Sequence, residues 1–423
     1  MHDIDTKTFC AAPWFSLRTN TDGSFAPCCQ FSPTLSKFQG KKTYTVDNDS
    51  IEEWTNSDYM KQVRQQLKEG KKIEECKKCW EKEKNNIISL RQEINDSVTD
   101  NQGNELQNTW INSFFKNPDR KIPLLTADVK ISNLCNYSCV MCNAHDSSII
   151  FKKWYREKEN MFVQEEIKKN QNYFNDIKSL NKKKYSYDLL FEVLKHPIKH
   201  LKFLGGEPLL EKKLLKILSQ IGDEKKKNIS LHFISNGSVD IQELVKRYRL
   251  HYKSISISIS LEGIEDVQEW ARKGSSWKNV EKNIILAKNN NIQVSIAHTI
   301  QMGTILRLDT LLKWCKENNL PMTFTYLDNP PYLSANNLST VLKETIMKKI
   351  SMNKIIFSKT INSHYNDGEI SSENLIQFLK EKFKNNNADK DKNKIYTFYK
   401  FIEWYEKDSQ LKLKNIVPEL YYK

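Results

Sequence analysis

The sequence predicts an α/β protein built around a partial (β/α)6 barrel of the TIM type, with a cysteine-rich domain before the barrel and a helical region after it. Three observations support this fold class. Six β-rich runs alternate with amphipathic stretches over residues 122–328, which is typical of βα units and a parallel sheet. Five of the nine cysteines fall before residue 110, and the chain becomes helical and charged after residue 328. A right-handed series of βα units curls toward a barrel.

The first predicted domain, residues 1–110, contains turn-rich pieces and one clear helical stretch. Apolar residues recur at near-helical spacing over 50–69, which predicts a single helix there; they are Trp54, Met60, Val63 and Leu67. Asp49 or Ser50 is expected to cap this helix.

The barrel itself is expected to occupy residues 122–328. Its six predicted strands are 124–132, 198–204, 229–235, 254–261, 292–299 and 321–327. The amphipathic stretches between them include 209–221, 240–251, 277–290 and 307–319. Segment 145–197 is longer than one crossover needs, so we interpret it as a Lys-rich helical insertion that is either a substrate lid or a decoration.

The third predicted region, residues 329–423, begins at Asn329 with Pro330 and Pro331 after it. A flexible loop is expected over 384–394. The aromatic residues that follow favour a packing face over a base-stacking platform; they are Tyr396, Phe398, Tyr399, Phe401, Trp404 and Tyr405.

The composition excludes some classes of protein. Hydrophobic residues make up 39% of the 423 residues, enough for a core, so full disorder is excluded. No run approaches the roughly 20 apolar residues of a membrane span, and the N-terminus lacks the pattern of a signal peptide. We therefore expect a cytoplasmic protein without a membrane partner, in which clustered cysteines are metal ligands or catalysts and not disulfides.

The formal net charge is +14, with 66 Lys and Arg against 52 Asp and Glu. Lys, Asn and Ile are used together throughout, as over 288–292, which indicates an AT-biased genome. A solvated basic surface and a patch for nucleic acid or an acidic substrate both remain open.

The sharpest motif is a C-x3-C-x2-C triplet, Cys135, Cys139 and Cys142, just past the first barrel strand. Three thiolates on one loop hold three irons of a 4Fe-4S cluster and leave the fourth iron without a protein ligand. An open coordination position is typical of a catalytic metal site. The alternative is a zinc site, for which His145 is the nearby fourth ligand.

This triplet resembles the signature of the radical S-adenosylmethionine (SAM) superfamily. The resemblance implies that the open iron chelates SAM and that the reduced cluster cleaves SAM to methionine and a 5′-deoxyadenosyl radical, which takes a hydrogen atom from substrate. An electron donor such as flavodoxin or ferredoxin is implied as well.

Further motifs follow in the order of the predicted strands. Gly205, Gly206 and Glu207 resemble the family's GGE motif, which meets the SAM amine. Asn236 lies in a segment that resembles the family's TNG segment near the ribose, and Ser260 lies in a segment similar to SLDG. Arg272 matches an Arg of the family that pairs with the SAM carboxylate. Glu262 stands where this pattern has Asp, so no role is assigned to it. These sites fall at the carboxyl ends of strands, where barrel active sites lie.

The N-terminal cysteines form a second constellation. Cys10, Gly23 and Cys28 are spaced C-x12-G-x4-C, and Cys76 and Cys79 form a CxxC pair. This pattern resembles the SPASM and twitch domains of radical SAM enzymes, although here the domain precedes the barrel. The resemblance implies an auxiliary 4Fe-4S cluster on Cys10, Cys28, Cys76 and Cys79, with Cys29 a neighbour or substitute. A structural zinc site is the alternative.

The remaining candidates have structural interpretations. Cys315 is expected to be a buried core thiol, and His298 and Gln301, after the fifth strand, to be satisfied polar residues. The sequence as a whole therefore predicts a radical SAM enzyme that acts on an unknown peptide, sugar or other small molecule, with no residue assigned to the substrate step. The alternative is a non-catalytic Fe-S electron carrier or a nucleic-acid-binding Fe-S protein.

Overall fold

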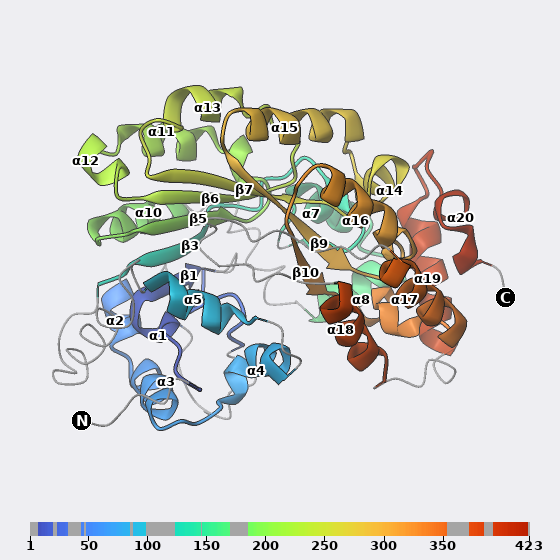
Figure 1. The fold of residues 1–423 in the computed structure, drawn as a ribbon, viewed down its shortest axis with the longest axis horizontal. Helices are drawn as coiled ribbons and strands as arrows, with labels where there is room; N and C mark the ends of the chain where they lie inside the picture. Colours follow the sequence, from blue (N-terminus) through green and yellow to red (C-terminus); the bar gives the residue numbers. More distant parts are fainter. Residues whose placement is uncertain are drawn as a thin grey trace.

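The computed structural model describes the chain over ten ranges. These are 7–19, 23–32, 44–45, 48–84, 88–98, 123–144, 146–169, 185–352, 372–384 and 392–421. Within them, a twisted sheet carries helices on its outer face, and helical groups from the two ends of the chain flank it (Figure 1). Among these residues no helix is both long and apolar enough to cross a membrane.

The central sheet has eight strands in the order β10-β9-β7-β6-β5-β3-β1-β2. Six of them are the predicted barrel strands, all confirmed and all parallel: β3 (Thr126–Lys130), β5 (His200–Leu204), β6 (Ser230–Ser235), β7 (Ser254–Ser260), β9 (Gln293–Ile300) and β10 (Met322–Tyr326). The α/β fold class is therefore confirmed.

The sheet is wider than the six strands expected, because the N-terminal segment joins it. Strand β1 (Ser16–Thr19) pairs in parallel with β3, and the two-residue β2 (Phe25–Ala26) pairs antiparallel with β1. Four and two residues are too short for a recognisable alternation in the sequence. Leu17 of β1 is fully buried beside Ala127 of β3, so β1 contributes to the main core.

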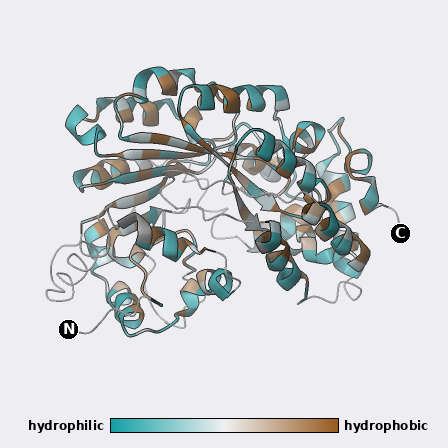
Figure 2. Ribbon diagram, in the orientation of Figure 1, coloured by the Kyte–Doolittle hydropathy of each residue, from teal (hydrophilic) through white to brown (hydrophobic). Residues whose placement is uncertain are grey.

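The two faces of the sheet differ in polarity, because successive side chains of a strand point to opposite faces. On β7 the isoleucines enter the main core with residues of the outer helices, whereas the serines face the other way. A polar row crosses five neighbouring strands on that inner face: Arg18, Asp128, Lys202, His232 and Ser256. In Figure 2, hydrophobic residues lie along the strands and on parts of the outer helices, while α12 (Asp223–Lys226) is hydrophilic.

Helices follow the barrel strands as predicted. Each predicted amphipathic stretch contains one: α11 (Lys212–Gln220), α13 (Gln242–Tyr248), α15 (Trp277–Asn289) and α16 (Leu308–Glu317). The crossover regions add η3 (Pro208–Leu210), α14 (Glu265–Ala271), β8 (Arg272–Lys273) and η4 (Ile305–Arg307). Segment 145–197 supplies α7 (Ser148–Arg156), α8 (Met161–Lys169) and α10 (Tyr185–Lys195), with His145 and residues 170–184 outside the described ranges.

The N-terminal helices are α1 (Ala12–Phe15), α2 (Ile51–Thr55), α3 (Asp58–Lys68), η2 (Glu74–Cys76), α4 (Lys77–Lys84) and α5 (Leu90–Val98). The prediction of one helix over 50–69 is wrong. Ser57 interrupts it, since its hydroxyl donates to the Trp54 carbonyl and accepts from the Met60 N–H, which makes it the N-cap of a second helix. Ser50 caps the first helix in a capping box with Glu53.

The C-terminal region packs against the barrel through η5 (Pro331–Leu333), η6 (Ala335–Asn337), α17 (Thr340–Met352), α18 (Ser372–Lys384), α19 (Lys392–Tyr405), α20 (Leu413–Ile416) and η8 (Pro418–Leu420). The predicted packing face is confirmed, because Phe398, Phe401 and Tyr405 of α19 are buried in the main core. Of the loop expected over 384–394, residues 385–391 lie outside the described ranges, and α19 already begins at Lys392.

Candidate metal and cofactor site

The loop that follows β3 carries the cysteine triplet and is fixed at both ends. Its two-residue strand β4 (Ser138–Cys139) pairs antiparallel with β8, so that Cys139 lies opposite Arg272. At the far end, the Ser147 hydroxyl donates to the Tyr137 carbonyl and accepts from the Ile150 N–H at the start of α7. The three thiols are thus presented by a tethered loop at the carboxyl edge of the sheet.

The thiols lie among hydrogen-bond donors and interact with one another. The Cys135 Sγ accepts from the Tyr137 N–H at 3.5 Å and from Asn236 Nδ2 at 3.8 Å. The Cys139 Sγ accepts from Arg272 Nη1 at 3.6 Å. Burial raises the pKa of Cys139 to about 11, against the opposing charge of Arg272, and raises the pKa of Cys142, where Cys139 adds to the effect. Metal binding has to displace these protons, and the surrounding donors suit the anionic sulfur.

Gly205 and Gly206 lie where the turn after β5 meets this loop. The Gly206 N–H donates to the Ser132 carbonyl and the Glu207 N–H donates to the Leu134 carbonyl. A Cβ atom on Gly206 would lie 2.2 Å from the Leu134 carbonyl oxygen. Gly205 has a φ of +128° and would place its Cβ 2.5 Å from the Ser132 oxygen. Only glycines allow the turn to approach the cysteine loop this closely.

Glu207 is almost completely buried, and its carboxylate is directed at the end of β6. It accepts hydrogen bonds from the Leu209 N–H, the Ser235 hydroxyl and the Asn236 N–H, the last at 2.6 Å. Burial raises the pKa of Glu207 from its ordinary 4.5 to about 7, although these hydrogen bonds oppose the shift.

Asn236 joins the end of β6 to the cysteine loop. Besides its contact with Cys135, its Nδ2 donates to Asn136 Oδ1 at 2.9 Å, and its Oδ1 accepts from the Ser238 N–H. Asn136 was not a sequence candidate, because a lone Asn between two cysteines has no distinguishing pattern. Ser260 ends β7 and is partly exposed.

Arg272 and Glu262 form a buried ion pair at the same edge. Arg272 Nη2 donates to Glu262 Oε1 at 2.7 Å, and the Glu262 side chain is fully buried. The sequence assigned no role to Glu262, because the motif that it resembles has Asp at this place. The structure thus brings Asn236 into contact with Cys135 and Arg272 into contact with Cys139.

The expectation for His298 and Gln301 is only half right. Both are buried, and His298 Nδ1 bonds the Leu261 carbonyl. Nevertheless, His298 Nε2 and Gln301 Nε2 have no hydrogen-bond partner among the described residues. Cys315 is fully buried, as predicted.

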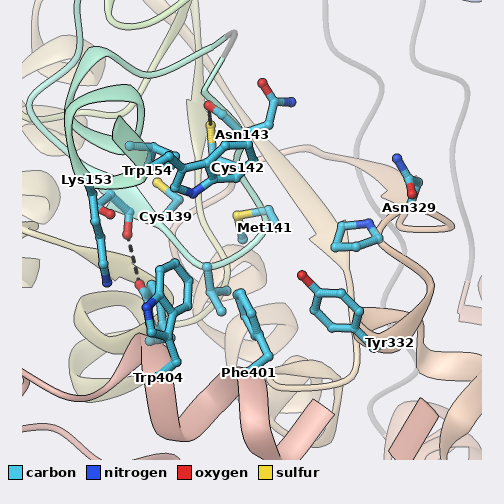
Figure 3. Close-up of a pocket in the computed structure, with 15 residues that line it drawn as sticks. Cys139, Met141, Cys142, Asn143, Lys153, Trp154, Asn329, Tyr332, Phe401 and Trp404 are labelled. Atoms are coloured by element: carbon cyan, nitrogen blue, oxygen red, sulfur yellow. Dashed lines mark hydrogen bonds between the residues drawn. The ribbon is translucent and has the colours of Figure 1, made fainter. Parts of the chain in front are cut away.

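A hollow adjoins the cysteine loop on the side of α7 and α19 (Figure 3). Its lining combines Cys139, Met141 and Cys142 with Lys153 and Trp404. The Lys153 ammonium lies 4.1 Å from the centre of the Trp404 ring, and burial lowers its pKa. Asn329 and Tyr332 lie on the opposite side of the hollow (Figure 3), and Pro330 also lines it.

The N-terminal cysteines gather in a second core cluster of their own; they are Cys10, Cys28, Cys29, Cys76 and Cys79. Burial raises the pKa of Cys28, with further contributions from each of the other four thiols, so all five lie within electrostatic range. Burial also raises the pKa of Cys10 to about 12. Arg91 is placed beside this group by its ion pair with Glu83 at 2.8 Å and its hydrogen bond to the Phe9 carbonyl.

The two groups of thiols fit iron–sulfur clusters in chemistry and number. The barrel loop has three thiols, of which Cys135 and Cys139 accept from N–H donors, and the N-terminal group has five. Within the described ranges, no three His, Cys, Asp or Glu side chains are arranged to hold a single metal ion. Arg272 Nε is buried without a hydrogen-bond partner among these residues, which suits a site that still has a ligand to receive.

Comparison with known proteins gives two family matches. The model of the radical SAM superfamily matches residues 129–315, and that of an iron–sulfur cluster-binding domain, SPASM, matches residues 10–80. No curated protein matches the chain at a significant level.

Solved structures give weaker matches. Native anSMEcpe with bound AdoMet and Kp18Cys peptide is 17% identical, with a TM-score of 0.37 over 54% of this chain and 59% of that one. Native anSMEcpe with bound AdoMet is 16% identical, with a TM-score of 0.36 over 54% and 60%. TYW1 with a lysine-pyruvate adduct bound is 14% identical, with a TM-score of 0.29 over 58% and 78%. The chain thus spans about three fifths of the length of the first two of these structures.

Proposed function

This chain belongs to the radical SAM superfamily and carries an N-terminal SPASM-type iron–sulfur domain, and from that premise we propose how its residues divide the work. Cys135, Cys139 and Cys142 hold a 4Fe-4S cluster with one open iron. The cluster and SAM together supply reductive cleavage of SAM to methionine and a 5′-deoxyadenosyl radical, which abstracts a hydrogen atom from the substrate.

The observation that carries this proposal is the convergence of successive strand ends on one loop. Asn236 after β6 and Arg272 after β7 both contact cysteine sulfurs, and the turn after β5 is hydrogen-bonded to the same loop. Separate chain segments thus deliver hydrogen-bond donors to two of the three thiols, Cys135 and Cys139, which supports a shared ligand at this loop.

The SAM-binding residues proposed are Gly205, Gly206, Glu207, Asn236, Ser260 and Arg272. Among them Arg272 is suited to the SAM carboxylate, because guanidinium binds carboxylates in a fixed planar geometry. Asn236 holds the cysteine loop against β6, and the glycines keep the turn close to it. The task of these residues is to orient SAM and keep water from the reacting atoms.

Three regions share the work in this proposal: an auxiliary iron–sulfur domain over 1–110, the radical SAM barrel over 122–328 with its insertion over 145–197, and a helical C-terminal region over 329–423. We propose that Cys10, Cys28, Cys76 and Cys79 ligate a second 4Fe-4S cluster, with Cys29 as neighbour or substitute. Four thiolates leave no open iron, so this cluster transfers electrons or supports structure.

The substrate that we propose is a peptide, a sugar or another small molecule. The polar inner face of the sheet, with Asp128, Lys202 and His232, supports a polar substrate.

The electron donor that we propose is an acidic carrier such as flavodoxin or ferredoxin. Lys153 lines the same hollow as Cys139 and Cys142, which supports approach of an anionic protein there. A cytoplasmic location is part of the same proposal.

The test is SAM cleavage by protein loaded anaerobically with iron and sulfide and reduced with dithionite. Wild type is expected to form 5′-deoxyadenosine, and the variant C135A/C139A/C142A none. That variant should keep about four irons per chain if the auxiliary cluster is a 4Fe-4S cluster; zinc or no metal in it would overturn the auxiliary-cluster proposal.

If fully loaded wild type forms no 5′-deoxyadenosine, the proposal of a radical SAM enzyme is contradicted and a non-catalytic Fe-S protein is favoured. Salt-sensitive retention of the same protein on heparin would then identify a nucleic-acid-binding role, in keeping with the net charge of +14.

A further inference from the structure

Glu262 is a fully buried carboxylate at the end of β7, and both of its oxygens are used. Oε1 accepts from Arg272 Nη2 at 2.7 Å, and Oε2 accepts from the Thr299 N–H on β9 at 3.1 Å. The His298 Nδ1 lies 3.6 Å from Oε2. A buried charge persists when it is paired and hydrogen-bonded in this way.

The backbone of Glu262 is held as firmly as its side chain. The Glu262 N–H donates to Gln268 Oε1 at 2.8 Å, while Gln268 Nε2 donates to the Ser260 carbonyl. Since Gln268 is a fully buried residue of α14, the carboxylate projects from a turn clamped between β7 and α14.

Arg272 therefore lies between the Glu262 carboxylate and the Cys139 thiol. Its Nη2 is fixed by Glu262 and its Nη1 contacts the Cys139 sulfur at 3.6 Å. Its Nε is buried and lacks a hydrogen-bond partner in the part of the chain that the structure describes. Two of the three guanidinium nitrogens, Nη1 and Nη2, are thus held by protein groups, and the third, Nε, remains available to a ligand.

The length of the side chain explains why glutamate serves here. Glu262 spans from the turn after β7 to Arg272 on one side and to the Thr299 N–H on the other. An aspartate on the same backbone is one methylene shorter, so its carboxylate falls short of at least one of these two donors.

We propose that Glu262 is a positioning residue: it holds the Arg272 guanidinium at the orientation in which Arg272 receives the carboxylate of SAM. The inference rests on the proposed function, because it assigns Glu262 a part in the same site. Without Glu262, Cys139 is the one remaining side-chain partner of the guanidinium among the described residues, so the orientation of Arg272 is no longer fixed from two sides.

The test measures SAM binding to iron-loaded, oxidised protein by equilibrium dialysis, which requires no turnover. Glu262→Gln keeps the shape but removes the charge, and it is expected to raise the Kd of SAM about tenfold, the scale of one charge-assisted hydrogen bond. The spectral change that SAM induces in the electron paramagnetic resonance of the reduced cluster should shift to correspondingly higher SAM concentration. Unchanged SAM affinity in E262Q overturns the proposal.

Action through Arg272 is tested by a double-mutant cycle. In an R272Q background, E262Q should have no further effect on the Kd of SAM. Full additivity of the two effects would show that Glu262 acts independently of Arg272 and would overturn the proposal.

Two further variants keep the test decisive. Glu262→Asp retains the charge and protects the fold, and its Kd for SAM should lie between those of wild type and E262Q. A wild-type Kd in E262D would show that the exact placement of the carboxylate is unimportant. The matched control is Glu406→Gln, another buried carboxylate, which accepts from Trp270 Nε1 and the Leu413 N–H. It should bind SAM as wild type does. If wild type itself binds no SAM, the proposed function fails and not the role of Glu262.

Discussion

At the scale of single residues, the carboxyl edge of the sheet combines buried charges whose partners come from distant parts of the chain. The Glu207 carboxylate accepts hydrogen bonds from two backbone N–H groups, those of Leu209 and Asn236. Its neighbours at the site are the thiol of Cys135 and the guanidinium of Arg272, both of which it influences electrostatically. The protonation of Glu207 should therefore be visible in the stability of the protein.

The first prediction concerns this pH dependence. Because burial raises the pKa of Glu207 from 4.5 to about 7, the folded protein binds this proton more tightly than the unfolded chain. The resulting stabilisation is fully present below pH 4.5 and is lost as the pH rises through 7, by about 3 kcal/mol at most. The free energy of unfolding of wild type should fall over this interval relative to that of Glu207→Gln. Denaturation series at several pH values, without iron or SAM, measure the difference; parallel curves would contradict it.

Residues such as Glu207 and Arg272 were found from sequence because they stand in ordered motifs. Glu262 also stands in such a motif, but no role was assigned to it because the pattern has Asp there, and Asn136 stands in none. The contacts of these two residues with Arg272 and Asn236, respectively, are not revealed by any spacing along the chain. A motif indicates which residues meet a ligand, whereas the residues that hold them in place become visible only in three dimensions.

At the scale of elements, all six barrel strands were predictable because their runs of aliphatic and aromatic residues are long enough to be recognised between helical stretches. The shorter elements were not. The break between α2 and α3 depends on the Ser57 side chain, and the apolar spacing continues across it. Strand β1 is too short to stand out, and its partner β3 lies more than 100 residues later in the chain.

The second prediction concerns the contact between the turn after β5 and the cysteine loop. Gly206→Ala places a methyl group 2.2 Å from the Leu134 carbonyl, so the loop has to move. The expected cost is about 2 kcal/mol, as for overpacking elsewhere, together with reduced iron loading at the triplet. Thermal unfolding and iron analysis measure the two effects.

The matched control for this variant is Gly222→Ala. Gly222 has an extended backbone, with φ of −61°, and nothing lies within 4 Å of its added Cβ. Its stability should change by less than about 0.5 kcal/mol. Equal melting temperatures for the two variants would show that the close approach at Gly206 is unimportant.

At the scale of the whole molecule, the C-terminal helix α19 stabilises the loop that carries the triplet. The Tyr405 hydroxyl donates to the Ser138 carbonyl at 2.9 Å and lies 3.0 Å from the Trp270 carbonyl. The sequence predicted that the aromatic side of α19 packs, but not against what. The barrel site is thus completed by a residue 267 positions after the loop it supports.

The third prediction follows from that contact. Tyr405→Phe removes the hydroxyl that donates to the Ser138 carbonyl, at a cost of about 1–2 kcal/mol, and should accelerate loss of iron from the triplet to a chelator. Tyr396→Phe on the same helix is the control, since Tyr396 is 63% exposed, and should behave as wild type. Identical iron release from both variants would contradict the supporting role of α19.

Strand β1 has a consequence for chimeras in which the N-terminal module is exchanged between related proteins. The N-terminal iron–sulfur module is joined edge to edge with the barrel by a backbone ladder, in which Arg18 lies opposite Asp128 and Leu17 opposite Ala127. The N-terminal module is therefore not an independent domain attached only by a linker. A chimera that exchanges this module between relatives has to carry a compatible first barrel strand with it, so the natural unit of exchange extends beyond the cysteines into the barrel itself.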